Sequence, residues 1–214
     1  MSVVIVDYGS GNLHSAAKAF ERQAATLDSP PKVLVSGRPE DVRAAERLVL
    51  PGVGAFGDCR DGLRAVAGLW EAVAEFVEQR ARPFFGICVG MQLMARQGLE
   101  HGTHDGFGWI DGVIDRIVPS DPSLKIPHMG WNELQVQSDH PVFRDLGEDP
   151  HAYFVHSYAF AGMSSGEVLA KVEYGGPVVA AVGHGHMIGT QFHPEKSQHV
   201  GLTLIRNFLT WSPG

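Results

Sequence analysis

Short apolar, β-branched runs alternate with segments of helical periodicity through the first half of the chain, and this alternation constrains the fold more than any other feature. The pattern predicts strands and helices in turn over Val3–Val6, Asn12–Ala24, Val33–Val35, Glu40–Ala45, Leu48–Leu50, Asp61–Arg80, Phe84–Ile87 and Val89–Gln97. It favours βαβ units, because two parallel strands need a crossover, usually a helix, between them. We therefore expect an α/β fold with a doubly wound, mostly parallel open sheet and flanking helices.

From Gly108 onward the pattern is mainly that of strands. The predicted strands are Trp109–Val118, Glu133–Val136, Tyr153–Phe160, Val168–Val172, Val178–Val182 and Met187–Phe192, and a helix over Ser197–Thr210 follows them. We expect these strands to add an antiparallel portion to the sheet. The length of 214 residues suits one unit, so we predict a single domain over residues 1–214.

Charge and cysteine content exclude several classes of protein. The chain has 17 Lys and Arg against 24 Asp and Glu, a formal net charge of −7, which disfavours capture of nucleic acid or anionic lipid. Its first residues predict neither a signal peptide nor a membrane span, since only Val3–Val6 are apolar before Asp7. Two cysteines, Cys59 and Cys88, are too few for a secreted disulfide framework. We expect a cytoplasmic protein whose partners are small molecules or another protein.

The first of three notable turns follows the predicted strand Phe84–Ile87. Residues 86–90 read G-I-C-V-G, the form of a nucleophile elbow, in which small neighbours let the chain bend sharply around an exposed nucleophile. Cys88 then stands at the N-terminus of the helix predicted over Val89–Gln97, where unpaired N–H groups favour a thiolate. The alternative is a buried cysteine that acts as a small hydrophobic residue.

The second turn is His193-Pro194-Glu195, at the end of a predicted strand. Pro194 restricts the backbone of His193 to extended conformations, so His193 and Glu195 can point to the same side. An imidazole oriented by a carboxylate is the base of a nucleophilic triad, although this spacing alone is also that of a surface ion pair. Together with the cysteine elbow, the pair predicts a Cys88, His193 and Glu195 triad.

The third turn, P-G-V-G-A-F-G over residues 51–57, contains the pattern G-x-G-x-x-G. Dinucleotide binding also needs an acidic residue about 20 positions later, at the end of the next strand. Glu71 and Glu75 fall within a predicted helix instead, so we favour backbone N–H groups that form an oxyanion hole. Residues 9–11, G-S-G, are a weaker candidate for phosphate binding, because His14 occupies the third glycine position.

The 11 histidines raise the question of a metal site. Two groups have ligand types that zinc accepts: His184, His186 and His193 with Glu195, and His101 and His104 with Asp105. The first two histidines fall in a hairpin-like turn remote from His193, and the second group in a glycine-rich loop. A hairpin-like turn and a glycine-rich loop are both typical of solvent-exposed surface, so we predict no metal and no cofactor.

Residue chemistry thus indicates a cysteine hydrolase or transferase without naming its substrate, and here a resemblance adds to it. The segment G-I-C-V-G-M-Q at 86–92, with H-P-E at 193–195, resembles the class I glutamine amidotransferases. Further segments resemble the glutaminase subunits of imidazole glycerol phosphate synthases, nearly end to end. These segments are V-D-Y-G-S-G-N-L at 6–13, L-P-G-V-G-A-F at 50–56, P-H-M-G-W-N at 127–132, Y-F-V-H-S-Y at 153–158, and 191–198.

The resemblance implies hydrolysis of L-glutamine, with ammonia passed to a separate (βα)₈-barrel cyclase in a heterodimer of histidine biosynthesis. The cyclase would produce imidazole glycerol phosphate and an aminoimidazole carboxamide ribonucleotide. Cys88 would attack the glutamine side-chain amide, and His193, oriented by Glu195, would carry the proton to the leaving ammonia. A glutaminase of this kind is expected to be weakly active alone, with the segment Pro51–Gly54 misaligned until the partner's site fills.

The resemblance also assigns roles to residues around the triad. It implies an oxyanion hole from backbone N–H groups at Val53, Gly54 and Val89, and substrate binding by Gly52 and Gln92. It places four residues toward the cyclase and the ammonia path: Asn12, Trp131, Tyr158 and Lys196.

Two features depart from the family pattern: Val89 stands where leucine is frequent, and the loop Thr26–Pro31 is a few residues longer than usual. Neither touches the predicted triad. Two alternatives stay open from the sequence, a stand-alone hydrolase or peptidase on the same fold and a binding subunit with a silent site.

Overall fold

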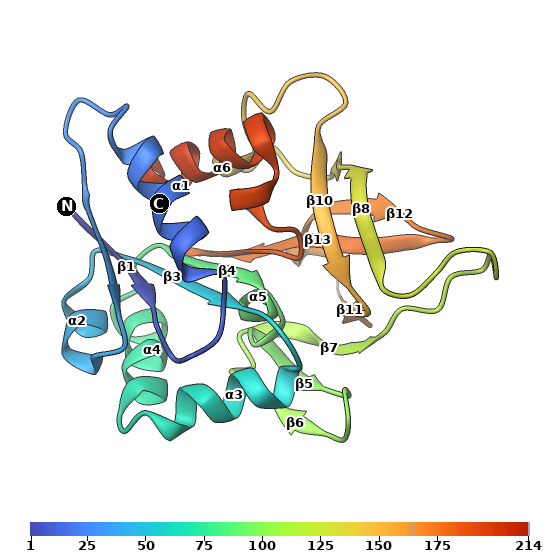
Figure 1. Cartoon of the computed structure of the whole chain (residues 1–214), viewed down its shortest axis with the longest axis horizontal. Coiled ribbons are helices and arrows are strands. Elements are labelled where there is room, and N and C mark those ends of the chain that lie inside the picture. The colour runs from blue at the N-terminus through green and yellow to red at the C-terminus, as the bar shows by residue number, and fades with distance from the viewer. Residues whose placement is uncertain (164, 214) are drawn as a thin grey trace.

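The computed structural model describes residues 1–163 and 165–213 and is built around one eight-stranded sheet (Figure 1). In order across the sheet, the strands are β2 (Lys32–Ser36), β1 (Ser2–Val6), β3 (Arg47–Gly52), β4 (Phe84–Cys88), β14 (Met187–Thr190), β13 (Pro177–His184), β12 (Val168–Glu173) and β9 (Gln135–Val136). The first five pair in parallel and the last three join them antiparallel. The predicted fold class, a mostly parallel sheet with an antiparallel addition, is confirmed.

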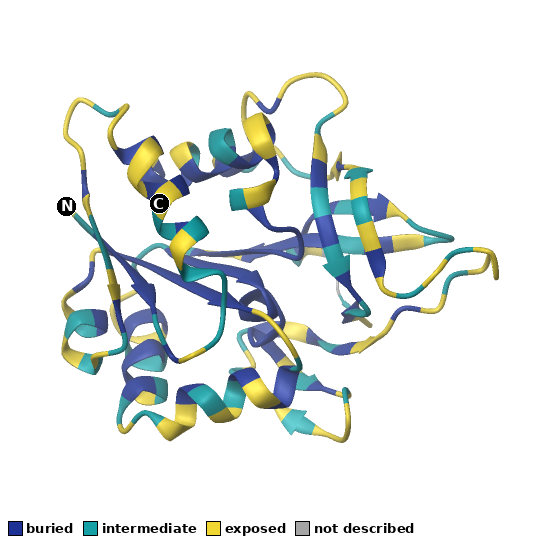
Figure 2. Cartoon of the chain, in the orientation of Figure 1, coloured by how far each residue is buried: buried dark blue, intermediate teal, exposed yellow. Residues whose placement is uncertain are grey.

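Helices cover both faces of this sheet (Figure 1). On one side α1 (Leu13–Ala24) packs against α6 (Gln198–Thr210), and on the other lie α2 (Pro39–Ala44), α3 (Phe56–Ala65) and α4 (Leu69–Glu78). The central strands are buried along their length (Figure 2), as expected for a sheet covered on both faces. Under α1 and α6, the ring centroids of Phe85 and Phe208 lie 5.2 Å apart, and Phe20 meets Phe208 edge-on at 6.3 Å.

Several strands stand outside the main sheet, and this corrects the expectation that the strands from Gly108 onward simply extend it. A four-stranded sheet contains β11 (Tyr158–Ala161), β7 (Ile110–Arg116), β5 (Ala95–Gly98) and β6 (His104–Asp105), and a two-stranded one contains β10 (His151–His156) and β8 (His128–Glu133). The predicted strand Tyr153–Phe160 is therefore two strands that change sheets at Ser157. In Figure 1, β8, β10 and β11 lie to the right of the parallel strands, and β5 and β6 lie below them.

Two predicted helices are wrong in length. The helix predicted over Asp61–Arg80 is interrupted at Gly68, whose φ of +77° lies in the left-handed region that glycine adopts without a steric penalty. The helix predicted over Val89–Gln97 is only α5 (Val89–Gln92), because the residues after it pair as β5 with β6 and β7. Three 3₁₀ turns, Pro141–Phe143, Ser165–Glu167 and Pro194–Lys196, complete the described elements. None of the described helices combines the length and apolar character needed to cross a bilayer.

Candidate active site

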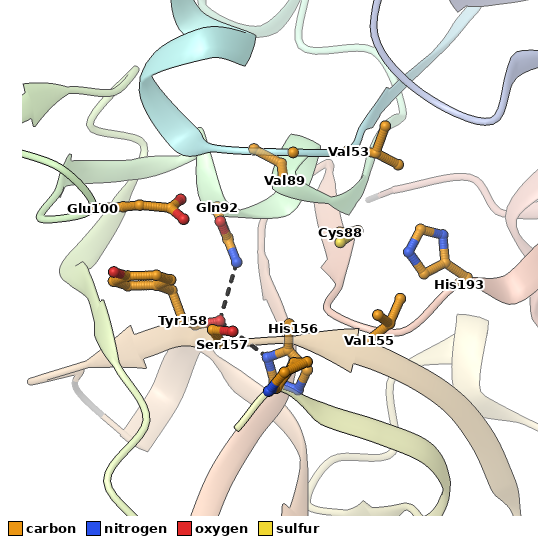
Figure 3. Close-up of a pocket in the computed structure, with 12 residues that line it drawn as sticks. Val53, Cys88, Val89, Gln92, Glu100, Val155, His156, Ser157, Tyr158 and His193 are labelled. Carbon is orange, nitrogen blue, oxygen red and sulfur yellow. Dashed lines mark hydrogen bonds between the residues drawn. The ribbon is translucent and has the colours of Figure 1, made fainter. Parts of the chain in front are cut away.

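Cys88 ends β4 in a sharp turn. Its φ of +54° and ψ of −111° are unusual for a residue with a side chain, a kind of strain that concentrates at functional sites. The turn depends on its glycines: a Cβ at Gly90 would overlap the Leu50 carbonyl, and one at Gly86 would press on the Gly90 carbonyl. The turn holds Cys88 at the edge of a cavity, with its side chain directed into it (Figure 3), although the residue is only 5% exposed.

The helix after Cys88 is shorter than predicted, so it favours a thiolate at Cys88 less than the sequence analysis expected. A helix of four residues, Val89–Gln92, has unpaired N–H groups but little aligned backbone dipole to favour a thiolate. Stabilisation of a thiolate at Cys88 therefore depends on these N–H groups and on the side chains that face its sulfur.

His193 and Glu195 come to Cys88 from the neighbouring strand. β14 runs parallel to β4, and the chain continues from it to His193 at the same edge of the sheet. The His193 backbone is extended, as predicted, but Glu195 reaches its partner through the 3₁₀ turn Pro194–Lys196. Nδ1 of His193 lies 2.9 Å from Oε1 of Glu195, and both side chains are almost completely buried. Because a carboxylate only accepts, Nδ1 carries the hydrogen and Nε2 is left for Cys88, beside which the ring lies in Figure 3.

Charge favours a protonated His193. Burial alone lowers the pKa of this imidazole, but the hydrogen bonds and charges of Cys88 and Glu195 outweigh burial and raise the pKa to about 10. An imidazolium at neutral pH is the expected companion of a neighbouring thiolate. The structure thus brings the three predicted triad residues together.

The segment expected to form the oxyanion hole lies beside the elbow. Gly52 of β3 pairs with Cys88 of β4, and the next two residues, Val53 and Gly54, line the cavity together with Val89. The Val53 N–H, however, donates to Ser10 Oγ at 3.1 Å and so is engaged away from the cavity. Gly52 does not line the cavity, and a Cβ there would stand 2.8 Å from the Tyr8 hydroxyl.

Gln92 forms part of the cavity wall and is almost completely buried. Its Nε2 donates to the carbonyl of Tyr158 at 3.1 Å (Figure 3). The same Nε2 also donates to Oε1 of Gln191 at 3.1 Å. Both amide hydrogens are used in these bonds, so Oε1 is the atom left for a ligand.

The cavity has a volume of about 300 Å³ and contains residues that the sequence analysis did not single out: Glu100, Pro127, Val155, His156 and Ser157. Glu100 holds the start of α3, where its Oε2 accepts the Phe56 N–H at 2.9 Å, and its carboxylate faces the cavity in Figure 3. Its role was hidden because the segment before it was predicted as helix. Residues 155–157 lie in the family-like segment 153–158, which was the only sequence signal for them.

Two neutral histidines support the cavity floor. Nδ1 of His128 lies 3.0 Å from Nε2 of His156, whose own Nδ1 lies 3.0 Å from the Tyr158 carbonyl. Burial lowers the pKa of each imidazole to about 4. Both rings are therefore uncharged at neutral pH, and each can donate one hydrogen bond and accept another.

Of the four residues expected to face a partner, only Trp131 and Lys196 lie near the same side chain, Tyr153. Trp131, 48% exposed on β8, meets the Tyr153 ring edge-on at 6.0 Å, and Lys196 Nζ lies 6.0 Å from the same ring. Tyr158 lies at the cavity instead. Asn12 immediately precedes α1, whose first turn shares a surface hollow with Lys196.

The histidine groups considered for metal binding are separated. His184 and His186 flank the β13–β14 turn, where they face Glu167 Oε1 at 3.5 Å and the Val77 carbonyl at 2.8 Å. His104 stacks on Phe56. Within residues 1–163 and 165–213, no three His, Cys, Asp or Glu side chains are grouped as metal ligands would be.

Known proteins resemble this chain in sequence and in fold. Residues 4–211 match the family model "Glutamine amidotransferase class-I". A solved structure described as a glutamine amidotransferase superposes with a TM-score of 0.72 at 21% identity, covering 98% of this chain and 97% of the other. A glutamine amidotransferase from Thermotoga maritima gives 0.64 at 14% identity, with 98% and 96% covered. These two likenesses concern the fold. The chain belongs to the class I glutamine amidotransferase family.

Its curated relatives define the branch more narrowly. The imidazole glycerol phosphate synthase subunits HisH of Bradyrhizobium diazoefficiens and Cereibacter sphaeroides are each 59% identical to this chain over the full length of both proteins. The HisH subunit of Rhodospirillum rubrum is 54% identical, again over both full lengths. Within the class I amidotransferases, the chain groups with the HisH subunits of imidazole glycerol phosphate synthase.

Proposed function

We propose that this protein hydrolyses L-glutamine to glutamate and ammonia and passes the ammonia to a separate (βα)₈-barrel cyclase subunit of imidazole glycerol phosphate synthase. The observation that carries the proposal is the buried His193–Glu195 bond of 2.9 Å beside Cys88, at a cavity of about 300 Å³. With ammonia, the cyclase forms imidazole glycerol phosphate and an aminoimidazole carboxamide ribonucleotide in the cytoplasm. The two free thiols suit such a reducing compartment.

In this mechanism Cys88 acts as the nucleophile. Its thiolate attacks the side-chain amide carbon of glutamine, and the C–N bond breaks as His193 Nε2 donates a proton to the leaving ammonia. The product of this step is a γ-glutamyl thioester. His193, now neutral, takes a proton from water, which attacks the thioester, and glutamate leaves as the thiolate is restored. Glu195 keeps the imidazole in the tautomer that both steps need.

Two side chains of the cavity wall suit a glutamine ligand. Glu100 presents the carboxylate expected opposite an α-ammonium group, and the free Oε1 of Gln92 can accept a further N–H. Glu100 adds a recognition group to those implied by the family resemblance.

The state of the oxyanion segment supports control by a partner. The Val53 N–H can stabilise an oxyanion at the thioester-forming step only if it leaves Ser10 Oγ and turns toward Cys88. In the described conformation the tetrahedral intermediate lacks this donor. A partner that favours the turned conformation would raise turnover without contacting glutamine.

The surface for the cyclase is proposed around β8. Met129 and Trp131 are 61% and 48% exposed on alternate positions of this strand. The Tyr153 ring contacts Trp131 edge-on, and Lys196 lies near the same ring. Large apolar side chains such as Met and Trp are enriched at protein–protein interfaces, which favours this exposed pair as a partner surface. We place Asn12 and Tyr158 on the ammonia side of the same heterodimer.

The test is glutamate release from glutamine by the chain alone and with the cyclase plus its phosphoribulosyl ligand, with Cys88→Ala as the blank. Strong stimulation that disappears in Cys88→Ala supports the proposal. Equal activity with and without the cyclase would indicate a stand-alone hydrolase. Absence of release under both conditions would indicate a silent binding subunit.

A further inference from the structure

We propose that Gln191 is a positioning residue for the nucleophile: its side-chain N–H, held in one orientation by neighbouring groups, donates a hydrogen bond to Cys88 Sγ and stabilises the thiolate. This inference rests on the proposed function in taking Cys88 as the nucleophile. It assigns a role to a residue outside the triad and outside the oxyanion segment.

Gln191 is fixed in place by its backbone and by burial. It follows β14 directly, its N–H donates to the Ala180 carbonyl at 2.8 Å, and the residue has no exposed surface. Its Nε2 lies 3.6 Å from Cys88 Sγ, a hydrogen-bonding distance for sulfur. Water has no access to this amide, so the sulfur and Gln92 are its partners.

The orientation of the Gln191 amide follows from a backbone carbonyl. The Tyr158 oxygen can only accept, so the group of Gln92 that lies 3.1 Å from it must be the amino end, Nε2. The same Nε2 lies 3.1 Å from the Gln191 side chain, which must therefore present Oε1 to it. Nε2 of Gln191 is left facing Cys88. Reversing this amide would bring two amino groups together and direct an oxygen at the thiolate.

His156 is a second donor to the Tyr158 carbonyl, and the direction of donation is the same in the hydrogen bonds behind it. His156 must carry its hydrogen on Nδ1 to bond this oxygen, so its Nε2 accepts from Nδ1 of His128. Nε2 of His128 in turn accepts from Asn132 Nδ2 at 3.2 Å. Burial lowers the pKa of both imidazoles to about 4, so both rings stay neutral near pH 7 and the direction of these hydrogen bonds does not change there.

Gln191 can stabilise negative charge on Cys88 Sγ at every step of the reaction, which His193 cannot. His193 gives up its proton during the reaction, whereas an amide keeps its hydrogens and continues to stabilise negative charge on sulfur. The four-residue α5 offers little dipole for this purpose. Gln191 is therefore expected to lower the energy of the thiolate before attack and again when sulfur leaves the thioester.

The experiment compares Gln191→Met and Gln191→Asn with wild type in the full chain. Met has a similar length without a donor, and Asn keeps the amide but is one methylene too short to reach the sulfur. The rate of Cys88 alkylation by iodoacetamide is measured against pH, with mass spectrometry separating Cys88 from Cys59. Both variants should slow the alkylation of Cys88 at neutral pH by roughly tenfold, since hydrogen bonds to charged groups are among the stronger ones.

The matched control is Gln135→Met on the exposed strand β9, which should leave the alkylation profile unchanged. An unshifted profile in folded Gln191→Met and Gln191→Asn would overturn the inference, even if their turnover fell. Alkylation does not require glutaminase activity, so the two proposals can fail separately. A shifted profile in a chain that never releases glutamate would overturn the proposed function alone.

Discussion

The N–H of Val53 donates to the hydroxyl of Ser10 at 3.1 Å, and the same hydroxyl donates back to the Val53 carbonyl at 2.8 Å. Cys59 Sγ adds a bond of 3.3 Å to this carbonyl. Ser10, in the loop between β1 and α1, and Cys59, in α3, thus hold the peptide groups on both sides of Val53. Val53 directly follows Gly52, the residue that pairs with Cys88. The resting orientation of the oxyanion segment is maintained by a small number of identifiable bonds.

Ser10→Ala is expected to release this segment. Removing the hydroxyl leaves Val53 without its reciprocal partner, a change of about 1 kcal/mol for a typical hydrogen bond, so the turned conformation gains population by roughly fivefold. Glutamate release by the isolated chain should rise accordingly, and stimulation by the cyclase should fall. Ser29→Ala, in the exposed loop before β2, is the control. Unchanged basal release in Ser10→Ala would show that the Ser10 bonds do not limit activity.

Glu195→Gln tests the orientation of His193. The amide keeps the size of the carboxylate but removes the charge that helps raise the pKa of His193 to about 10. The imidazolium and thiolate should both be disfavoured, and kcat should fall on the order of 10²- to 10⁴-fold. Steady-state glutamate release in the presence of the cyclase measures the loss. A kcat within threefold of wild type would remove Glu195 from the mechanism.

The raised pKa of His193 also predicts a trend in stability. A base whose pKa rises on folding stabilises the native state fully below its unfolded pKa, near 6.5, and this contribution is lost as pH rises toward about 10. Wild type should therefore lose more Tm between pH 6.5 and 10 than Cys88→Ala, which lacks one of the partners that raise the pKa. Calorimetry across this range gives the comparison. Parallel curves for the two proteins would contradict the proposed charge pair.

The paired histidines predict the opposite trend at lower pH. Their pKa values of about 4 in the folded chain lie below the unfolded value, so the unfolded state binds more protons between pH 6.5 and 4. Stability should fall as pH falls through this window. His156→Gln, which retains a donor and an acceptor, should flatten this dependence, whereas His151→Gln on the exposed end of β10 should not. Thermal unfolding at several pH values provides the test, and an equal slope in His156→Gln would refute it.

The sequence was sufficient for features whose determinants are local. Alternating patterns predicted the parallel strands, and the glycines around Cys88 together with Pro194 predicted how the nucleophile and His193 are presented. It was insufficient where distant pairing overrides local preference: residues 95–98 have helical periodicity but pair with β6 and β7. For the same reason Glu100 and Gln191 were not recognised, since their partners Phe56 and Cys88 are 44 and 103 positions away.

Trp131→Ala tests the proposed cyclase surface. The indole is half exposed and held edge-on by Tyr153, so it is ordered before a partner binds and little side-chain entropy would be lost on association. Loss of a central aromatic anchor costs about 2 kcal/mol or more, which corresponds to an increase in Kd of roughly 30-fold. Titration calorimetry with the cyclase measures this, with Val118→Ala, a highly exposed apolar residue after β7, as the control. If both variants bind like wild type, the cyclase docks elsewhere and the proposed role of β8 is wrong.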